Sequence, residues 1–177
     1  MSSNDETDLL MYFSLQGQAL AAEGRTGASQ ADLNSDPLLK DFQVGSFFFI
    51  EDMQLGFDTP DAKSRGRRDN TIDMAPVRIT RKIDCASPQL MQACVDARTF
   101  DKAVIVKRRS AGGDRAGEGY IRFEFDYVLV TKIDWNDSGL IKENVTFIAR
   151  TVSMTYSGQN ADGTHVSTPS KSYSLFT

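Results

Sequence analysis

The chain has 177 residues and a mass of 19.6 kDa, the size of one domain or of one domain with a tail. Hydrophobic residues make up 40% and charged residues 25%, a globular and not a disordered composition. The 24 acidic and 20 basic residues give a net charge of −4 and a pI near 5.0. This balance argues against a general nucleic-acid binder, because such a protein carries a basic face.

The N-terminus and the hydropathy of the chain exclude two modes of membrane targeting. No apolar run approaches the roughly 18 residues that a membrane-spanning helix needs, so we expect no membrane insertion. Residues 1–6 are acidic, whereas a secretory signal peptide begins with a basic head and an apolar run. If the protein leaves the cell, we expect it to do so without an ordinary signal peptide.

The dominant pattern along the chain is that of β-strands. Between residues 120 and 130, Ile121, Phe123, Phe125, Tyr127 and Leu129 share one face and charged residues occupy the other. This period of two predicts a long strand with one wet side. Alternating patterns or continuous apolar runs predict further strands at residues 10–15, 42–57, 77–83, 103–109, 145–156 and 164–175.

Residues 145–156 change phase in the middle of their apolar pattern. Val145 and Phe147 alternate in one phase, whereas Val152 and Met154 alternate in the other. A slip of one residue turns every later side chain to the opposite face of a strand. We therefore predict a β-bulge near Arg150.

One helix interrupts the strands, at about Ser87–Arg98. Ser87 is a favourable N-cap, and Pro88 at the first helical position costs no hydrogen bond. Leu90, Cys94 and Ala97 form an apolar stripe that would lie against a sheet. A single helix within a run of strands predicts a mainly β protein, a two-sheet β-barrel or sandwich with one flanking helix.

Two polar segments, Gln16–Pro37 and Asp58–Ala75, are longer than ordinary connections. Unstructured loops of this length in a compact domain are usually functional or disordered. The second segment, a long extended loop, contains charges of both signs that we expect to act in interactions between subunits. Its candidate interaction residues are Arg65, Arg67, Arg68, Asp69 and Asp73.

The sequence contains few residues or motifs suited to catalysis, metal binding or cofactor binding. Its cysteines, Cys85 and Cys94, and its histidine, His165, are too few for a zinc site in one chain. No nucleophile elbow and no phosphate-binding loop followed by a helix is present. We therefore predict no catalytic residue, no cofactor and no metal. Paired carboxylates in a cleft stay open as an alternative.

Residues 79–94 resemble the strand-to-helix segment of the hemolysin-coregulated proteins (Hcp), the inner-tube proteins of type VI secretion systems. The likeness extends, in order and with similar spacing, over about residues 72–165. Its further parts are residues 103–109, 111–114, 120–123, 128–130, 143–147 and 161–163.

The resemblance implies a function in assembly and no enzymatic activity. Residues 1–177 would form a single Hcp-like tube domain, six copies would form a ring, and rings would stack into a hollow tube. A contractile sheath would expel the tube, which a spike protein of the VgrG type would tip and which would carry effectors in its lumen. The protein would pass from the bacterial cytoplasm into the medium or a target cell.

Other functions fit the same residues. A phage-like tail-tube protein shares the architecture that the resemblance implies. A small β-barrel that binds a ligand, or that catalyses a reaction with carboxylates, would instead be a monomer or dimer with an enclosed pocket. An RNA-binding barrel would need a basic face with interleaved aromatic residues, which the sequence does not indicate.

Overall fold

The computed structural model describes residues 9–24, 29–58, 73–109, 117–159, 165–167 and 171–174. Within these ranges the protein is mainly β, as predicted. Its elements in chain order are β1 (Leu9–Leu15), β2 (Gln18–Ala19), α1 (Gln30–Ser35), β3 (Phe48–Gln54), β4 (Phe57–Asp58), β5 (Asp73–Met74), β6 (Val77–Lys82), α2 (Ser87–Val95), β7 (Thr99–Arg108), β8 (Gly119–Asp137), β9 (Ile141–Ile148), β10 (Thr151–Gln159), β11 (His165–Ser167) and β12 (Lys171–Ser174).

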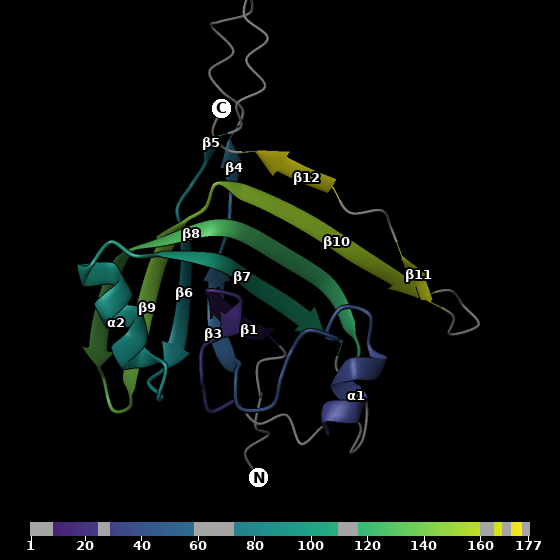
Figure 1. Ribbon diagram of the computed structural model, residues 1–177, viewed down its shortest axis with the longest axis horizontal. Coiled ribbons are helices and arrows are strands. Elements are labelled where there is room, and N and C mark those ends of the chain that lie inside the picture. The colour runs from purple at the N-terminus through teal and green to yellow at the C-terminus, as the bar shows by residue number, and fades with distance from the viewer. Residues whose placement is uncertain are drawn as a thin grey trace, which may run out of the picture.

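The strands form a closed barrel from which one edge extends (Figure 1). Neighbouring strands are antiparallel in the order β8–β7–β1–β3–β6–β9, and β9 pairs with β8 to close a six-stranded barrel. Strand β10 pairs with the first half of β8 outside this circle, and β11 and β12 pair with β10. The predicted β-barrel with a flanking helix is confirmed.

The barrel interior is an aromatic and aliphatic core. Phe13 is completely buried, and its ring centroid lies 6.1 Å from Phe48, 5.0 Å from Phe100 and 5.9 Å from Phe147. Because β1, β3, β7 and β9 each contribute a ring to this cluster, the strands cannot slide by one residue without moving a ring out of the core. Core packing therefore fixes the register of the barrel.

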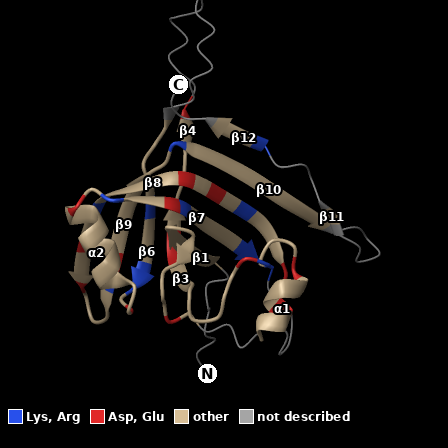
Figure 2. Cartoon of the chain, in the orientation of Figure 1, with Lys and Arg blue, Asp and Glu red and all other residues tan. Residues whose placement is uncertain are grey.

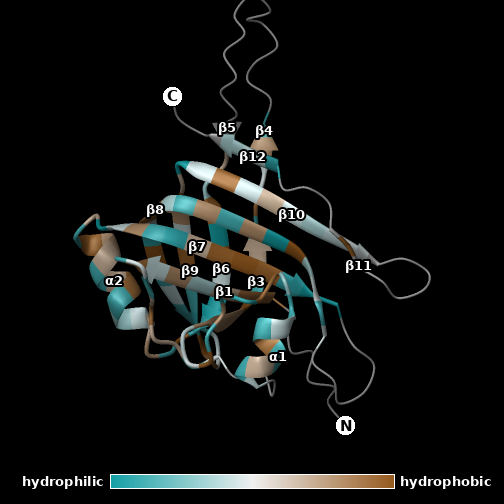
Figure 3. Ribbon diagram, turned by 45° about the vertical axis from the view of Figure 1, so that its right-hand side comes forward, coloured by the Kyte–Doolittle hydropathy of each residue, from teal (hydrophilic) through white to brown (hydrophobic). Residues whose placement is uncertain are grey.

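Strands β1 and β7 are buried on both faces. Met11 and Phe13 face the barrel interior, whereas Leu10 and Tyr12 belong to a second buried cluster outside the barrel wall. The second cluster is covered by α1 and by residues 36–47, so both strands read as continuous apolar runs. Figure 3 shows the hydrophobic stretch of β7.

We call α1 and residues 36–47 the covering segment, and the structure in this region differs from two sequence-based expectations. The predicted strand at residues 42–57 begins only at Phe48, because Phe42 and Phe47 are buried in the second cluster. The segment Gln16–Pro37, expected to be a long polar connection, contains β2 and α1.

Local hydrogen bonds hold α1 in place. Ser29 and Asp32 form a capping box, in which each side chain accepts a hydrogen bond from the backbone N–H of the other. The Gln30 side chain donates to the Phe42 carbonyl oxygen at 2.8 Å and accepts from the Val44 N–H at 2.9 Å. The helix is thereby fastened to the segment that follows it.

Strand β8 changes its buried face at Tyr127. The sequence predicts Phe125, Tyr127 and Leu129 on one dry face, but Tyr127 is 60% exposed, and Val128 and Val130 are buried instead. Tyr127 has a φ of 53°, in the left-handed region that non-glycine residues rarely adopt. The predicted uninterrupted alternation is therefore wrong beyond Phe125.

The phase change near Arg150 is not the predicted β-bulge. The chain forms two strands there, and the register against β8 is the same on both sides: Asp126 pairs with Thr151, and Leu129 with Ile148. The Arg150 N–H donates to the Asp126 carbonyl oxygen at 3.0 Å. The two paired strands change their buried face at the same position. Their register is therefore unchanged where β10 extends beyond the barrel.

Helix α2 is shorter than predicted and begins differently. Its N-cap is Ala86, which has no side-chain capping bond, and Ser87 is already helical. The buried side chains of the helix are Ser87, Leu90 and Ala93, whereas Ala97 lies outside the helix with a φ of 49°. A left-handed residue at this position ends a helix, so the predicted stripe through Ala97 is wrong.

The long loop at Asp58–Ala75 has ordered ends. Phe57 pairs with Met74, and Asp58 with Asp73, in the antiparallel ribbon of β4 and β5. Residues 59–72 lie outside the described residues, as do residues 111–114 and 161–163 of the Hcp-like pattern.

Replacing Phe13 by alanine tests the packed interior. We expect Phe13→Ala to lower the free energy of unfolding by about 3–5 kcal/mol, because the cavity would remove contacts with three rings. Urea unfolding followed by the fluorescence of Trp135 measures this loss at equal protomer concentration. In the control, Val44→Ala at a site that is 53% exposed, we expect a change within about 0.5 kcal/mol.

Candidate assembly surfaces

The residues predicted to mediate interactions are only partly covered by the structure. Arg65, Arg67, Arg68 and Asp69 lie outside the described residues. Asp73 is described as a backbone position of β5, where it pairs with Asp58. The structure therefore describes the ribbon at the base of this loop, and the role of the loop's charges stays a prediction.

The first surface is an exposed apolar sheet face beyond the barrel, which we call the extension face. Within β8 and β10, Phe125 pairs with Val152, and both are buried. Farther along the same face Met154 pairs with Phe123, but Met154 is 42% exposed. The extension face comprises Met154, Tyr156, Val166 and Tyr173, which are 42%, 41%, 49% and 48% exposed.

The extension face ends at an open sheet edge. Residues of β11 and β12 pair with β10 on one side, and among the described strands neither has a partner on its other side. An edge strand presents unpaired N–H and C=O groups that pair readily with another chain. Open backbone groups and exposed apolar side chains thus occur together at this part of the molecule.

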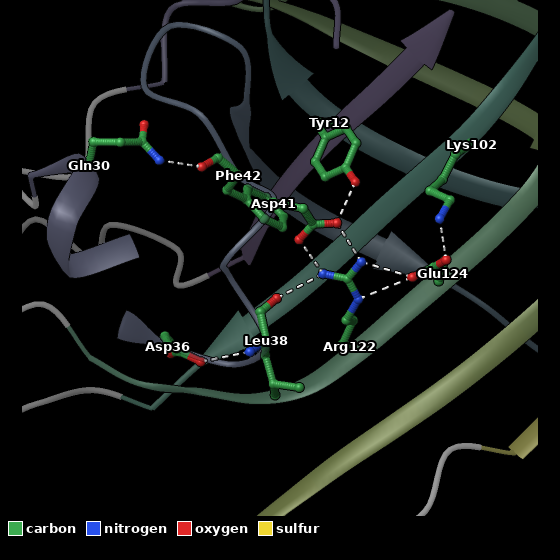
Figure 4. A network of polar contacts seen from close by, with 9 residues as sticks. All are labelled: Tyr12, Gln30, Asp36, Leu38, Asp41, Phe42, Lys102, Arg122 and Glu124. Atoms are coloured by element: carbon green, nitrogen blue, oxygen red, sulfur yellow. Dashed lines mark hydrogen bonds and ion pairs between the residues drawn. The ribbon is translucent and has the colours of Figure 1, made fainter. Parts of the chain in front are cut away.

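The second feature is a polar network on the outer wall of β1, β7 and β8 (Figure 4). The two terminal guanidinium nitrogens of Arg122 donate to the carboxylate of Asp41 at 2.6 Å each. One of them and Nε also donate to Glu124, at 2.8 and 3.3 Å. The Tyr12 hydroxyl donates to Asp41 at 2.6 Å, and Lys102 forms an ion pair with Glu124.

These contacts shift pKa values in the network, so that ionised Asp41, ionised Glu124 and protonated Tyr12 are favoured. Burial opposes ionisation of Asp41, but hydrogen bonds from Arg122 and Tyr12 outweigh it and lower the pKa of Asp41. Burial likewise opposes ionisation of Glu124, and contacts with Lys102 and Arg122 lower its pKa. Burial, followed by the hydrogen bond to Asp41, raises the pKa of Tyr12.

The network fastens the covering segment to the barrel. Arg122 donates to the Leu38 carbonyl oxygen at 2.9 Å, and the carboxylate of Asp36 accepts from the Gly119 N–H at 2.7 Å. Asp41 and Arg122 form a bidentate pair with two parallel hydrogen bonds. This arrangement serves as a structural clamp and offers no general base with a pKa near neutrality.

A third feature lies inside one end of the barrel. Arg81 and Glu143 are completely buried at paired positions of β6 and β9, and the Arg81 Nε lies 3.6 Å from the carboxylate. Asp84 and Ser87 also contact Arg81, and the guanidinium carbon lies 4.0 Å from the centre of the Phe48 ring. A buried charge is costly unless it is paired in this way.

The described residues contain neither a plausible metal site nor a membrane-spanning helix. No group of three or more His, Cys, Asp and Glu residues is placed to hold a metal ion in these parts of the chain. Both helices in the same ranges fall short of the length and hydropathy needed to cross a bilayer.

Solved structures with the same fold define the class. Hcp1 from E. coli EAEC 042 superposes with a TM-score of 0.68 at 14% identity and covers 97% of this chain and 99% of its own. Hcp1 from Salmonella typhimurium gives 0.65 at 14% identity, covering 96% of each chain. Secreted protein Hcp3 from Pseudomonas aeruginosa gives 0.61 at 18%, covering 94% of this chain and 98% of its own. The fold is that of the β-barrel proteins of type VI secretion.

Sequence comparison then shows the family. The family model for the type VI secretion system effector Hcp matches residues 40–156, and the chain belongs to the Hcp family. The curated protein hcp1 of Pseudomonas aeruginosa is 32% identical over 95 residues, which span 52% of this chain and 57% of that relative. Hcp proteins are structural secreted components of type VI secretion systems, so the predicted resemblance is confirmed.

The sequence alone indicates neither the extension face nor the two polar networks. Met154 and Tyr156 alternate with polar residues and therefore look like an ordinary half-buried strand. The partners of Arg122 and Glu143 come from distant segments, so no local spacing indicates them. Exposed aromatic residues at an open edge could only be recognised once strand order was known.

Replacing Asp41 by asparagine tests the polar clamp. The folded-state pKa of Asp41 lies below the value of about 4 expected in the unfolded chain, so its contribution to stability is present above that pH. This contribution is lost as the pH falls through the folded-state pKa. We expect Asp41→Asn to cost about 1–3 kcal/mol at pH 7 and progressively less below pH 4.

Chemical denaturation between pH 2 and pH 7 measures this difference. Asp52→Asn, at an exposed carboxyl group, is the matched control and should change stability by less than about 0.5 kcal/mol. A penalty for Asp41→Asn that is equal at all pH values would contradict an ionic role.

Proposed function

We propose that the chain is a ring-forming subunit of a type VI secretion tube. The observation that carries this proposal is the extension face, where exposed apolar side chains lie beside an open sheet edge. Exposed contiguous apolar surface on a soluble protein marks an interaction site. The family supports another copy of this chain as the partner.

The geometry of the extension suits a ring better than a symmetric dimer. The extension projects from one side of a closed barrel, so the surface that it offers differs from the surface on the far side of the barrel. Contact between two different patches is heterologous, and such contacts give rings when the rotation between subunits closes. Burying the extension face against a neighbouring barrel would also cover the open edge.

Family membership supports the rest of the assembly that we propose. Residues 1–177 act as a single tube domain, six copies form each ring, and stacked rings form a hollow tube. Sheath proteins surround and expel the tube, a VgrG-like spike protein tips it, and effectors travel in its lumen. The protein passes from the bacterial cytoplasm to the medium or a target cell, and it catalyses no reaction.

Charge substitution on the extension face tests ring formation. We expect the double variant Met154→Asp and Tyr156→Asp to stay folded but to remain monomeric, because burying two carboxylates against a neighbour is unfavourable by several kcal/mol. Light scattering coupled to size-exclusion chromatography gives the mass, and negative-stain images show rings directly.

The matched control is Val95→Asp on α2, an apolar position that is 79% exposed and outside the extension face. It should assemble like the unchanged protein. Rings of normal mass from the double variant would rule out this face as the ring contact, and a monomeric unchanged protein would refute the proposed function.

The charged loop is our candidate for stacking between rings. We expect replacement of Arg65, Arg67 and Arg68 by alanine to leave ring mass unchanged and to shorten stacks of rings, since charges of both signs set register and on-rate at an interface. Side views in negative stain measure stack length. Stacks of unchanged length would remove these arginines from the proposed interface.

A further inference from the structure

Three neighbouring strands change their buried face at the same level of the sheet. In β7 the interior residues on either side of this level are Phe100 and Ala103, which are three positions apart, whereas alternation would place them two apart. Strand β8 has the same spacing between Phe125 and Val128, both completely buried. The chain shifts in the same way at Arg150, where it passes from β9 to β10.

The three changes lie in one row across the sheet. The register between β7 and β8 places Asp101 opposite Tyr127. The register of β8 against β9 and against β10 places Tyr127 opposite Arg150. We call Asp101, Tyr127 and Arg150 the bend row, and all three side chains are exposed. Because the three strands shift together, they remain in register on both sides of the row.

Each strand has two successive residues at this level that lie outside the interior core. These residues are Asp101 and Lys102, Asp126 and Tyr127, and Arg150 and Thr151. An additional outward residue bends a strand, and bends of this kind make the corners at which a sheet curves around its core. Figure 1 shows the curved course of β8 and β10, and Figure 2 shows acidic and basic positions of β7 and β8 side by side where the sheet bends.

The middle strand makes the bend with a tyrosine in a left-handed conformation. Within the bend row only Tyr127 has a positive φ, of 53°. Glycine adopts this conformation freely, whereas the Cβ of any other residue approaches a backbone carbonyl oxygen. The Tyr127 side chain is 60% exposed, so burial in the core does not account for this residue type. Strained positions of this kind persist where the surrounding structure holds them, and they cluster at functional sites.

Contacts on both sides hold the bend row. The Arg150 N–H donates to the Asp126 carbonyl oxygen at 3.0 Å, and the Arg150 guanidinium carbon lies 5.6 Å from the centre of the Tyr127 ring. The Asp101 carboxylate accepts a hydrogen bond from the Gly17 N–H at 2.8 Å, which fastens the turn between β1 and β2 to the row. Backbone pairing and exposed side chains therefore both restrain the bend.

The angle at the bend row decides where the extension face points. Strand β10 begins at Thr151, directly after the row, and its nine residues span roughly 27–30 Å at about 3.3 Å per residue. Successive subunits of a closed ring are related by a rotation of about 60° for six subunits and about 51° for seven. A change of about 9° at the row would move the far end of β10 by roughly 4 Å. A close-packed contact does not absorb a displacement of that size.

We propose that the bend row sets the number of subunits in each ring, with Tyr127 and Arg150 as its positioning residues. The proposal rests on the proposed ring function and adds the feature that determines how the ring closes. The extension face lies on one side of the row, and the barrel that would receive a neighbour's extension face lies on the other. A fixed bend gives a single rotation between subunits, whereas a loose bend gives several.

Replacing Tyr127 by glycine tests this inference. We expect Tyr127→Gly to fold with unchanged or higher thermal stability, because glycine adopts a φ near 53° without strain. Glycine also adopts other backbone conformations, so the single ring mass should give way to a mixture of subunit numbers. Native mass spectrometry counts the subunits in each ring. Tyr127→Phe is the matched control: it keeps the aromatic ring beside Arg150 and should give one ring mass.

Arg150→Ala is a second variant that leaves the backbone hydrogen bond to Asp126 in place. It should also broaden the ring masses, because the side chain that restrains Tyr127 is gone. Hydrogen exchange measures the bend without assembly, in the monomeric background of Met154→Asp and Tyr156→Asp. There Tyr127→Gly should speed exchange of the Arg150 N–H and leave amides in the barrel interior unchanged.

Two outcomes would overturn the inference. The first is a single, unchanged ring mass from both Tyr127→Gly and Arg150→Ala, which would leave ring formation itself intact. The second is a folded Tyr127→Gly variant that stays monomeric at every concentration, which would show that the tyrosine side chain contacts the neighbouring subunit directly. Absence of rings in the unchanged protein would instead refute the proposed function.

Discussion

The architecture depends on one long strand that belongs to two structures at once. The second half of β8 closes the barrel against β9, and its first half carries the open extension through β10. Hydrogen bonding to β8 continues from β9 to β10. Tyr127 adopts a left-handed conformation at this point, and Arg150, which lies between β9 and β10, donates to the Asp126 carbonyl oxygen of β8. An edge strand bound only to the barrel rim would have no such support, so the position of the extension face follows from this strand.

Two arginine-centred polar networks have a structural role in this fold. Arg81 pairs with the buried carboxylate of Glu143, and Arg122 pairs with the half-buried carboxylates of Asp41 and Glu124. Arg122 thereby ties residues 36–42 to the barrel wall, and Arg81 ties the start of α2 to it. If the protein assembles as we propose, rigid subunits limit the entropy lost when each contact forms.

The sequence predicts the strands and the helix well because their patterns are local. The alternation in β6, the continuous apolar run in β7 and the Pro88 signal for α2 depend on neighbouring residues alone. The change of buried face at Tyr127 and Arg150 differs from the predicted alternation and β-bulge because it depends on two paired strands changing face together. Surfaces are harder still: Trp135 and Tyr156 are ordinary strand residues in the sequence, and only strand order shows that they emerge at an end or an edge.

The order of strands in the sheet also constrains how the chain folds. Strand β1 lies between β3 and β7, so Leu10 pairs with Phe49 on one side and with Val106 on the other. These partners are synthesised long after β1, and contacts of such high sequence separation require closure of large loops before they contribute any stability. The edge of β1 that pairs with β7 therefore stays unpaired until more than half of the chain has been synthesised, which favours slow folding and exposes apolar residues to aggregation in the meantime.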